Sequence, residues 1–246
     1  MKSKRASISF GALVALVGFV LSGPLGFLLV QITKPQPAWT SPEIFVSHYH
    51  FIQNVPYYFG FILVGGMLIL SAAHYINADQ ENAFDQLQIL LSLVFTIIFA
   101  TFILSNYICQ TTFIHHLASN YKSEYNNTIS TFTMANPDSV SWSIEMWGYG
   151  MLGIATWLLS AFYKEKSRVI YKVLIINGIV SLLSAVLYTI DAGWLLTTTG
   201  IVSYFVWNLL MIVLLVLVYR HSKYRKMTIK YSKQRQFWID KQSKMS

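Results

Sequence analysis

Six apolar runs occupy most of this chain, each about 20 residues long, the length that an α-helix needs to cross roughly 30 Å of hydrocarbon. They cover about residues 8–31, 57–76, 87–109, 146–163, 169–190 and 200–219. Only 11% of the residues are charged, whereas soluble domains have roughly 25%. The sequence therefore predicts an all-α integral membrane bundle of six transmembrane helices, forming a single domain over residues 1–246.

The positions of the basic residues predict the orientation of this bundle. If the N-terminus is inside, 16 of the 18 Lys and Arg residues fall in cytoplasmic segments. Cytoplasmic loops of membrane proteins carry such an excess, so both termini are expected in the cytoplasm of a multi-pass protein of a bacterial cell membrane. The net charge of +8 is explained by this topology, and no nucleic-acid partner is expected.

The tail over residues 220–246 is basic, with aromatic residues between its charges. Anionic lipids attract such a segment by about 1 kcal/mol per basic residue close to the membrane surface. Lys223, Arg225 and Lys226 are the predicted lipid-surface residues. Membrane lipids are thus the expected partners, and a second membrane protein is left open as a further one.

The first predicted outer loop contains a signal for the start of a helix. Ser41 offers a capping hydroxyl, Pro42 suits the first helical position, and Glu43 places an acid in the first turn. We therefore predict a short helix on the outer surface at about 42–53.

Glycine and proline predict two further features of the spans. Gly23 and Pro24 are expected to kink the first span. Gly148, Gly150 and Gly153 match G-x-G-x-x-G, but a dinucleotide site needs a preceding strand and an open helix N-terminus in water. We interpret these three glycines as positions of close helix packing.

The fifth run carries polar residues at helical spacing. Asn177, Ser181, Ser184, Tyr188 and Asp191 are 4, 3, 4 and 3 residues apart, which places them on one face of a helix. Lipid cannot satisfy their hydrogen bonds, so polar groups at membrane depth usually face neighbouring helices or a wet cavity. This face is expected to point into the bundle.

Topology brings further polar groups toward the same outer end. We predict an outward-facing polar pocket between the fourth, fifth and sixth spans, formed by Asn177, Ser181, Ser184, Tyr188, Asp191, Asn208 and Glu145. Four of these residues have a structural alternative, which for Asn177 and Asn208 is a hydrogen bond between helices. Asp191 could cap the loop that follows the fifth span, and Glu145 could stand in the first turn of the fourth, where the helix dipole favours an acid.

Four histidines are expected at the outer face and are the candidate metal ligands: His48, His50, His115 and His116. A catalytic zinc site takes three protein ligands and a water. The sequence has no H-E-x-x-H motif and only one cysteine, Cys109, so the metal remains undefined. Interfacial histidines are the alternative interpretation, and no cofactor is expected.

Several segments of the last half of the chain form a recognisable pattern: Asn136–Pro137, Trp142, Glu145–Gly150, Ala155–Trp157 and Asp191–Trp194. The pattern resembles one found in bacterial multi-pass membrane proteins that are described only as hypothetical. The resemblance implies no activity, cofactor or substrate. It implies that the short link between the fifth and sixth spans belongs to the architecture.

These patterns favour a binding, regulatory or accessory membrane protein. No acid–base pair, phosphate cradle or activated nucleophile is discernible, which favours a non-enzymatic role. A small-molecule transporter is the first alternative, although it requires a charged or broken helix at the bilayer midplane. An intramembrane enzyme that uses the outer His, Glu and Asp groups is the second.

Overall fold

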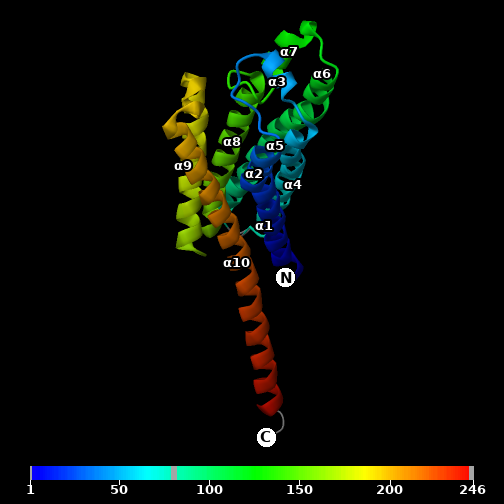
Figure 1. Cartoon of the computed structure of the whole chain (residues 1–246). Helices are drawn as coiled ribbons and strands as arrows, with labels where there is room; N and C mark the ends of the chain where they lie inside the picture. The colour runs from blue at the N-terminus through cyan, green and yellow to red at the C-terminus, as the bar shows by residue number, and fades with distance from the viewer. Residues whose placement is uncertain (1, 79–81, 244–246) are drawn as a thin grey trace.

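The computed structural model describes residues 2–78 and 82–243, with side chains over 6–78 and 82–223. These residues are helical with short connections and contain no strand (Figure 1). Five stretches are long and apolar enough to cross a membrane: Ala6–Thr33, Phe51–Ile76, Ala83–Ser119, Arg168–Ile190 and Thr198–Lys223. The all-α class is thereby confirmed, and five of the six predicted runs form helices long and apolar enough to cross a membrane.

The first span consists of two helices, α1 (Lys2–Ser22) and α2 (Pro24–Thr33), separated at Gly23. Pro24 has no backbone N–H to continue the ladder of α1, so the chain changes direction there. The predicted kink is confirmed.

Helix α4 (Val55–Ile76) packs along α1 at close range. A Cβ on Gly18 would meet the backbone of Leu63, and a Cβ on Gly66 would meet the backbone of Ala15. Small residues of this kind let two membrane helices approach to van der Waals contact. The pair α1 and α4 forms one wall of the bundle.

The third span is longer than its apolar run. Helix α5 (Ala83–Ile108) continues through the π-helical turn η2 (Cys109–Ile114) into α6 (His115–Ser119). Such π turns shift the faces of a helix locally. The helical segment therefore continues to Ser119, past the apolar run predicted at 87–109.

A small cap covers the end of the bundle that the sequence predicts to be outside, and it is called the outer cap. It contains α3 (Pro42–Ser47), the 3₁₀ turns η1 (Phe51–Asn54) and η3 (Ser123–Tyr125), and α7 (Asn126–Phe132). Its core consists of Phe45, Ile114, Leu117, Ala118 and Ile129. The outer helix predicted at 42–53 is therefore two short helices. The first helix ends at Ser47, and η1 begins separately because the His50 side chain caps it by accepting the Ile52 N–H.

Helix α8 (Val140–Leu159) lies between α5 and α9 (Arg168–Ile190) and ends in the 3₁₀ turn η4 (Ser160–Tyr163). A Cβ on Gly150 would contact the side chain of Ala185, and one on Gly153 would contact Ser181 and Gly178. The interpretation of these glycines as close-packing positions is confirmed.

Helix α10 (Thr198–Ser243) follows the 3₁₀ turn η5 (Ala192–Leu196) and packs on α1 as well as on α9. It extends far beyond the bundle, past the predicted end of the span at 219 (Figure 1). Lys223 is exposed and its Nζ donates to the Tyr219 hydroxyl at 3.0 Å. The side chains of Arg225 and Lys226 lie outside the described residues.

Candidate functional site

A cavity of about 660 Å³ lies beneath the outer cap. Its walls come from α1 and α2 on one side, α8 and α9 on the other, and the first turns of α10, with η1 and η5 near its rim. Twelve of its 35 lining residues are aromatic. A concave, mostly apolar cavity of this size is typical of sites that bind small molecules.

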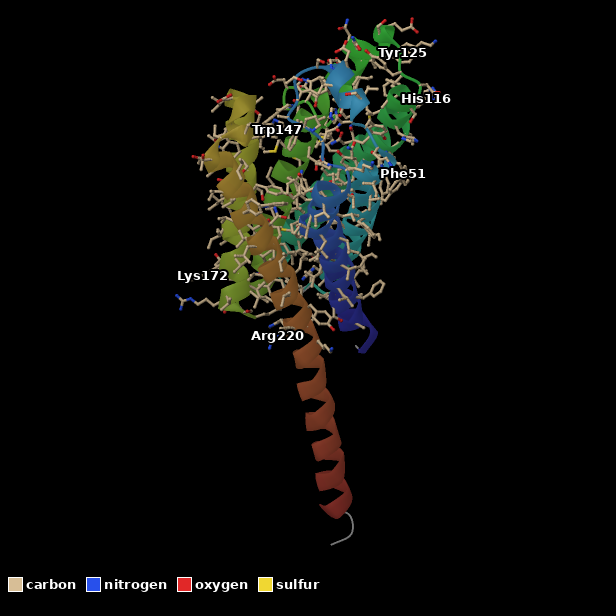
Figure 2. All side chains as sticks on the ribbon, in the orientation of Figure 1. Phe51, His116, Tyr125, Trp147, Lys172 and Arg220 are labelled. Atoms are coloured by element: carbon tan, nitrogen blue, oxygen red, sulfur yellow. The ribbon has the colours of Figure 1, made fainter. Side chains whose placement is uncertain are left out.

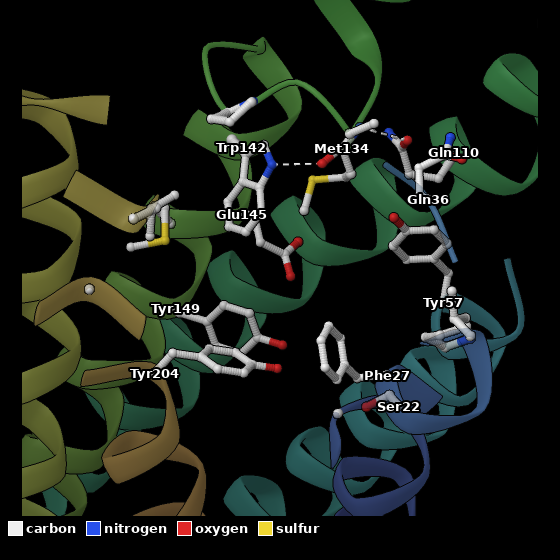
Figure 3. Close-up of a pocket in the computed structure, with 18 of the residues that line it drawn as sticks. Ser22, Phe27, Gln36, Tyr57, Gln110, Met134, Trp142, Glu145, Tyr149 and Tyr204 are labelled. Carbon is white, nitrogen blue, oxygen red and sulfur yellow. Dashed lines mark hydrogen bonds between the residues drawn. The ribbon is translucent and has the colours of Figure 1, made fainter. Parts of the chain in front are cut away.

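Glu145 is the one carboxylate among the described residues that line the cavity. Its side chain is only 8% exposed and points into the open space (Figure 3). Asn106 Nδ2 donates to Oε2 at 2.9 Å, and the Tyr107 hydroxyl donates to Oε1 at 2.9 Å. Both donors are neutral, since one is an amide and the other a phenol. The described lining contains no Lys, Arg or His.

The helix-capping interpretation of Glu145 is wrong. Helix α8 begins at Val140, and the Ser139 hydroxyl caps it by accepting the Trp142 N–H at 3.2 Å. The first turn contains no acid. Glu145 therefore lies inside the helix, where the dipole of the N-terminus does not explain its presence.

A polar network on α5 and η2 holds the Glu145 region in place. Gln110 Nε2 donates to Phe132 O at 2.8 Å, and its Oε1 accepts the Met134 N–H at 3.0 Å. Asn106 Nδ2 also donates to Ser141 O at 3.2 Å. This network ties the loop before α8 to the third span, so the carboxylate is supported by fixed neighbours.

Aromatic rings in contact with one another form the floor of the cavity. The Tyr149 and Trp207 rings meet edge to face at 4.9 Å, and Trp207 meets Phe19 at 5.5 Å in the same way. Tyr57 and Tyr107 have ring centroids 5.2 Å apart. The contacts link α1, α4, α5, α8 and α10, so the cavity is built where most of the spans meet.

Two further rings face each other across the opening. Figure 3 shows Tyr204 of α10 next to Tyr149, and Phe27 of α2 on the opposite side. Phe27 is 54% exposed and Tyr204 is 47% exposed. The side of the cavity between α2 and α10 is therefore partly open to the surroundings.

The polar face of α9 is buried, as its spacing predicts. Asn177, Ser181 and Tyr188 are 0%, 4% and 6% exposed. Asn177 Nδ2 donates to Thr156 Oγ1 at 3.0 Å, and the Tyr188 hydroxyl donates to Pro137 O at 2.8 Å. These bonds join α9 to α8 and to the loop before it.

Four of the seven predicted pocket residues line the cavity, and three do not. Those that do are Glu145, Ser181, Ser184 and Asn208. Asn177 and Tyr188 are used in helix contacts outside it. Asp191 is exposed and accepts the Gly193 N–H at 2.9 Å, because α9 ends at Ile190 and the extended backbone at 191 leaves the helical face.

The link between α9 and α10 is made by a residue that the sequence did not single out. Trp207 Nε1 donates to Ser181 Oγ at 2.9 Å, whereas Asn208 Nδ2 donates to Tyr204 O of its own helix. Trp207, Tyr149 and Tyr57 lie in apolar runs, where aromatic residues are common, so the sequence does not identify them as cavity residues. Their only sequence signal is an unusual aromatic density near the outer ends of several spans.

Three of the four histidines predicted as metal ligands make local hydrogen bonds. His48 Nδ1 lies 3.0 Å from Ile44 O, His50 caps η1, and His116 lies near Asn120. Among the described residues no three His, Cys, Asp or Glu side chains form a group that could hold a metal ion.

Tyr49 connects the cap to the rim of the cavity. Its hydroxyl lies 2.9 Å from His115 Nδ1 and accepts Asn54 Nδ2 at 2.7 Å. Burial raises the pKa of Tyr49 to about 12, so the hydroxyl keeps its proton at neutral pH and can donate it to His115.

Neither protein-family models, nor curated proteins, nor solved structures match this chain.

Proposed function

We propose that this chain is a six-span membrane protein, with both termini in the cytoplasm, that binds a small, largely apolar molecule in its outer cavity. Its role is that of a binding, regulatory or accessory protein. The observation that carries the proposal is a cavity of about 660 Å³ with aromatic walls and one supported carboxylate, Glu145.

Helix α8 is the sixth crossing in this proposal. Its 20 residues cover about 30 Å, enough to cross the hydrocarbon. It lies between α5 and α9, both long enough to span, and many of its residues are buried. A helix surrounded by protein does not need an apolar surface, which accounts for its glycines, serines and Glu145.

The charge distribution supports the orientation. Lys172 and Arg220 lie at one end of the bundle, and His116 and Tyr125 lie at the other (Figure 2). The first end also receives the N-terminus and α10 beyond the bundle (Figure 1). Because basic residues favour the cytoplasmic side, the cavity and its cap are placed outside.

Single cysteines test the orientation and the cavity together. In a Cys109→Ser background, a membrane-impermeant thiol reagent added to intact cells is expected to label Ser119→Cys and Ser184→Cys. Lys164→Cys is expected to react only after lysis. Ser119 and Lys164 are exposed at opposite ends, whereas Ser184 lines the cavity. Labelling of Lys164→Cys alone in intact cells would reverse the orientation.

The same variants test occupancy. The neutral apolar probe N-phenyl-1-naphthylamine is expected to slow the labelling of Ser184→Cys and to leave Ser119→Cys unchanged. Equal rates with and without the probe would count against a binding cavity.

Transport is the second candidate, because the break between α1 and α2 places Gly23 in the cavity wall. Broken helices commonly form the substrate sites of transporters. Sealed proteoliposomes distinguish the two functions. A binding protein saturates at an amount of probe equal to the amount of protein, whereas a transporter accumulates more.

A further inference from the structure

The charges around the cavity are unbalanced. Glu145 is the one acid in the described lining, and no basic side chain lies there to pair with it. Asn106 and Tyr107 supply hydrogen bonds but no positive charge. An ionised carboxylate in a largely apolar wall is costly unless a cation lies close to it. A positive group in the cavity would supply the missing partner.

The remaining walls suit a cation with an apolar body. The faces of Trp and Tyr rings attract positive charge, most strongly where water is excluded. Tyr149, Tyr204 and Trp207 lie on the same side of the cavity, and Figure 3 shows the first two close to the Glu145 carboxylate. A volume of about 660 Å³ exceeds what a simple ammonium ion fills, so apolar groups would occupy the rest.

We infer that the cavity selects amphipathic organic cations, such as ammonium or phosphonium compounds with aromatic or alkyl substituents. This inference rests on the proposed binding function and specifies its ligand class. Glu145 binds the positive head, the aromatic side chains surround it, and the body extends toward Phe27 and the opening between α2 and α10. An anion of the same shape is excluded because it would meet Glu145 with no cationic side chain to offset the repulsion.

Two ions of nearly identical shape and opposite charge test the inference. Radiolabelled tetraphenylphosphonium is expected to bind the purified full chain in lipid nanodiscs above the level in empty nanodiscs. Tetraphenylborate, measured in separate samples because the two ions precipitate together, is expected not to bind above that level. Glu145→Gln keeps the size of the side chain and is expected to weaken binding about tenfold or more, since hydrogen bonds and pairs that involve a charge are among the stronger polar interactions. Glu124→Gln is the matched control, because that carboxylate is exposed in the outer cap.

A second measurement keeps Glu145 intact. With Ser184→Cys in the Cys109→Ser background, a cationic methanethiosulfonate is expected to react about tenfold faster than an anionic one, after correction for their rates with a free thiol. This measurement remains decisive if Glu145→Gln fails to fold.

The outcomes separate the inference from the proposed function. Tetraphenylborate or neutral tetraphenylmethane could bind as well as tetraphenylphosphonium, with all binding lost in the cavity-filling variant Ser184→Trp. That result would overturn cation selection and leave the binding cavity standing. A preference of Ser184→Cys for the anionic reagent would also overturn it. If none of the three probes binds while N-phenyl-1-naphthylamine still protects Ser184→Cys, the inference fails and the proposed function survives.

Discussion

Valine in place of Gly66 is expected to prevent α1 and α4 from packing and to lower the free energy of unfolding by about 3 kcal/mol, the upper end of the usual cost of overpacking. A Cβ at this position would meet the backbone N and Cα of Ala15. Backbone atoms cannot rotate away as the tip of a side chain can, so the two helices would have to separate. Reversible unfolding of the detergent-solubilised chain by sodium dodecyl sulfate measures the loss.

The neighbouring residue gives the matched control. A Cβ on Gly65 would have no atom within 4 Å, apart from its two neighbours in the chain and the nearby backbone of its own helix. Gly65→Val makes the same chemical change one residue earlier in α4, with the same effects on helix propensity and hydropathy. It is expected to change stability by no more than about 0.5 kcal/mol. Equal losses in the two variants would contradict the packing explanation and point to helix propensity.

The helical architecture could be predicted because membrane spans obey a length rule and leave local signals. Pro24 breaks the first span where expected, and Ser41 caps α3 through its hydroxyl. Asn177, Ser181 and Tyr188 are buried because their spacing follows the helical period. These features depend only on residues close together in the sequence.

The boundaries of helices were less predictable where polar residues belong to them. The apolar run of α8 starts near Met146, but the helix starts at Val140, since buried Ser141 and Glu145 make hydrogen bonds inside the protein. An apolar run therefore indicates which residues can face lipid, but it does not give the ends of the helix. This is why the sequence leaves a first-turn position open for Glu145 beside its predicted place in the pocket.

The walls of the cavity could not be derived from the sequence because they depend on contacts between distant segments. Phe19 and Trp207 meet across α1 and α10, and Tyr57 and Tyr107 meet across α4 and α5. In α1 the small residues Gly11, Ala15 and Gly18 lie on the face that packs on α4, whereas hydropathy does not distinguish this face from the exposed one because both are apolar. Neither signal identifies which distant segment supplies the contact.

Leucine in place of Asn106 is expected to destabilise the chain by about 3 kcal/mol, because removing a neutral hydrogen-bond donor leaves one oxygen of the buried Glu145 carboxylate unsatisfied. Asn106 Nδ2 donates to Glu145 Oε2 and to Ser141 O. Its loss leaves the carboxylate with Tyr107 as the donor described for it. Thr101→Val is the control on the same helix, since Thr101 is exposed and bonds only to Ile97 O.

The double variant Asn106→Leu with Glu145→Leu separates lost hydrogen bonds from an orphaned acid. Removing both polar groups eliminates the unsatisfied carboxylate, so the double variant is expected to be about 1 to 2 kcal/mol more stable than Asn106→Leu alone. Unfolding of the four proteins of the cycle measures the coupling. Purely additive losses would mean that the two residues act independently, and the polar network would then not be what holds Glu145 in the cavity wall.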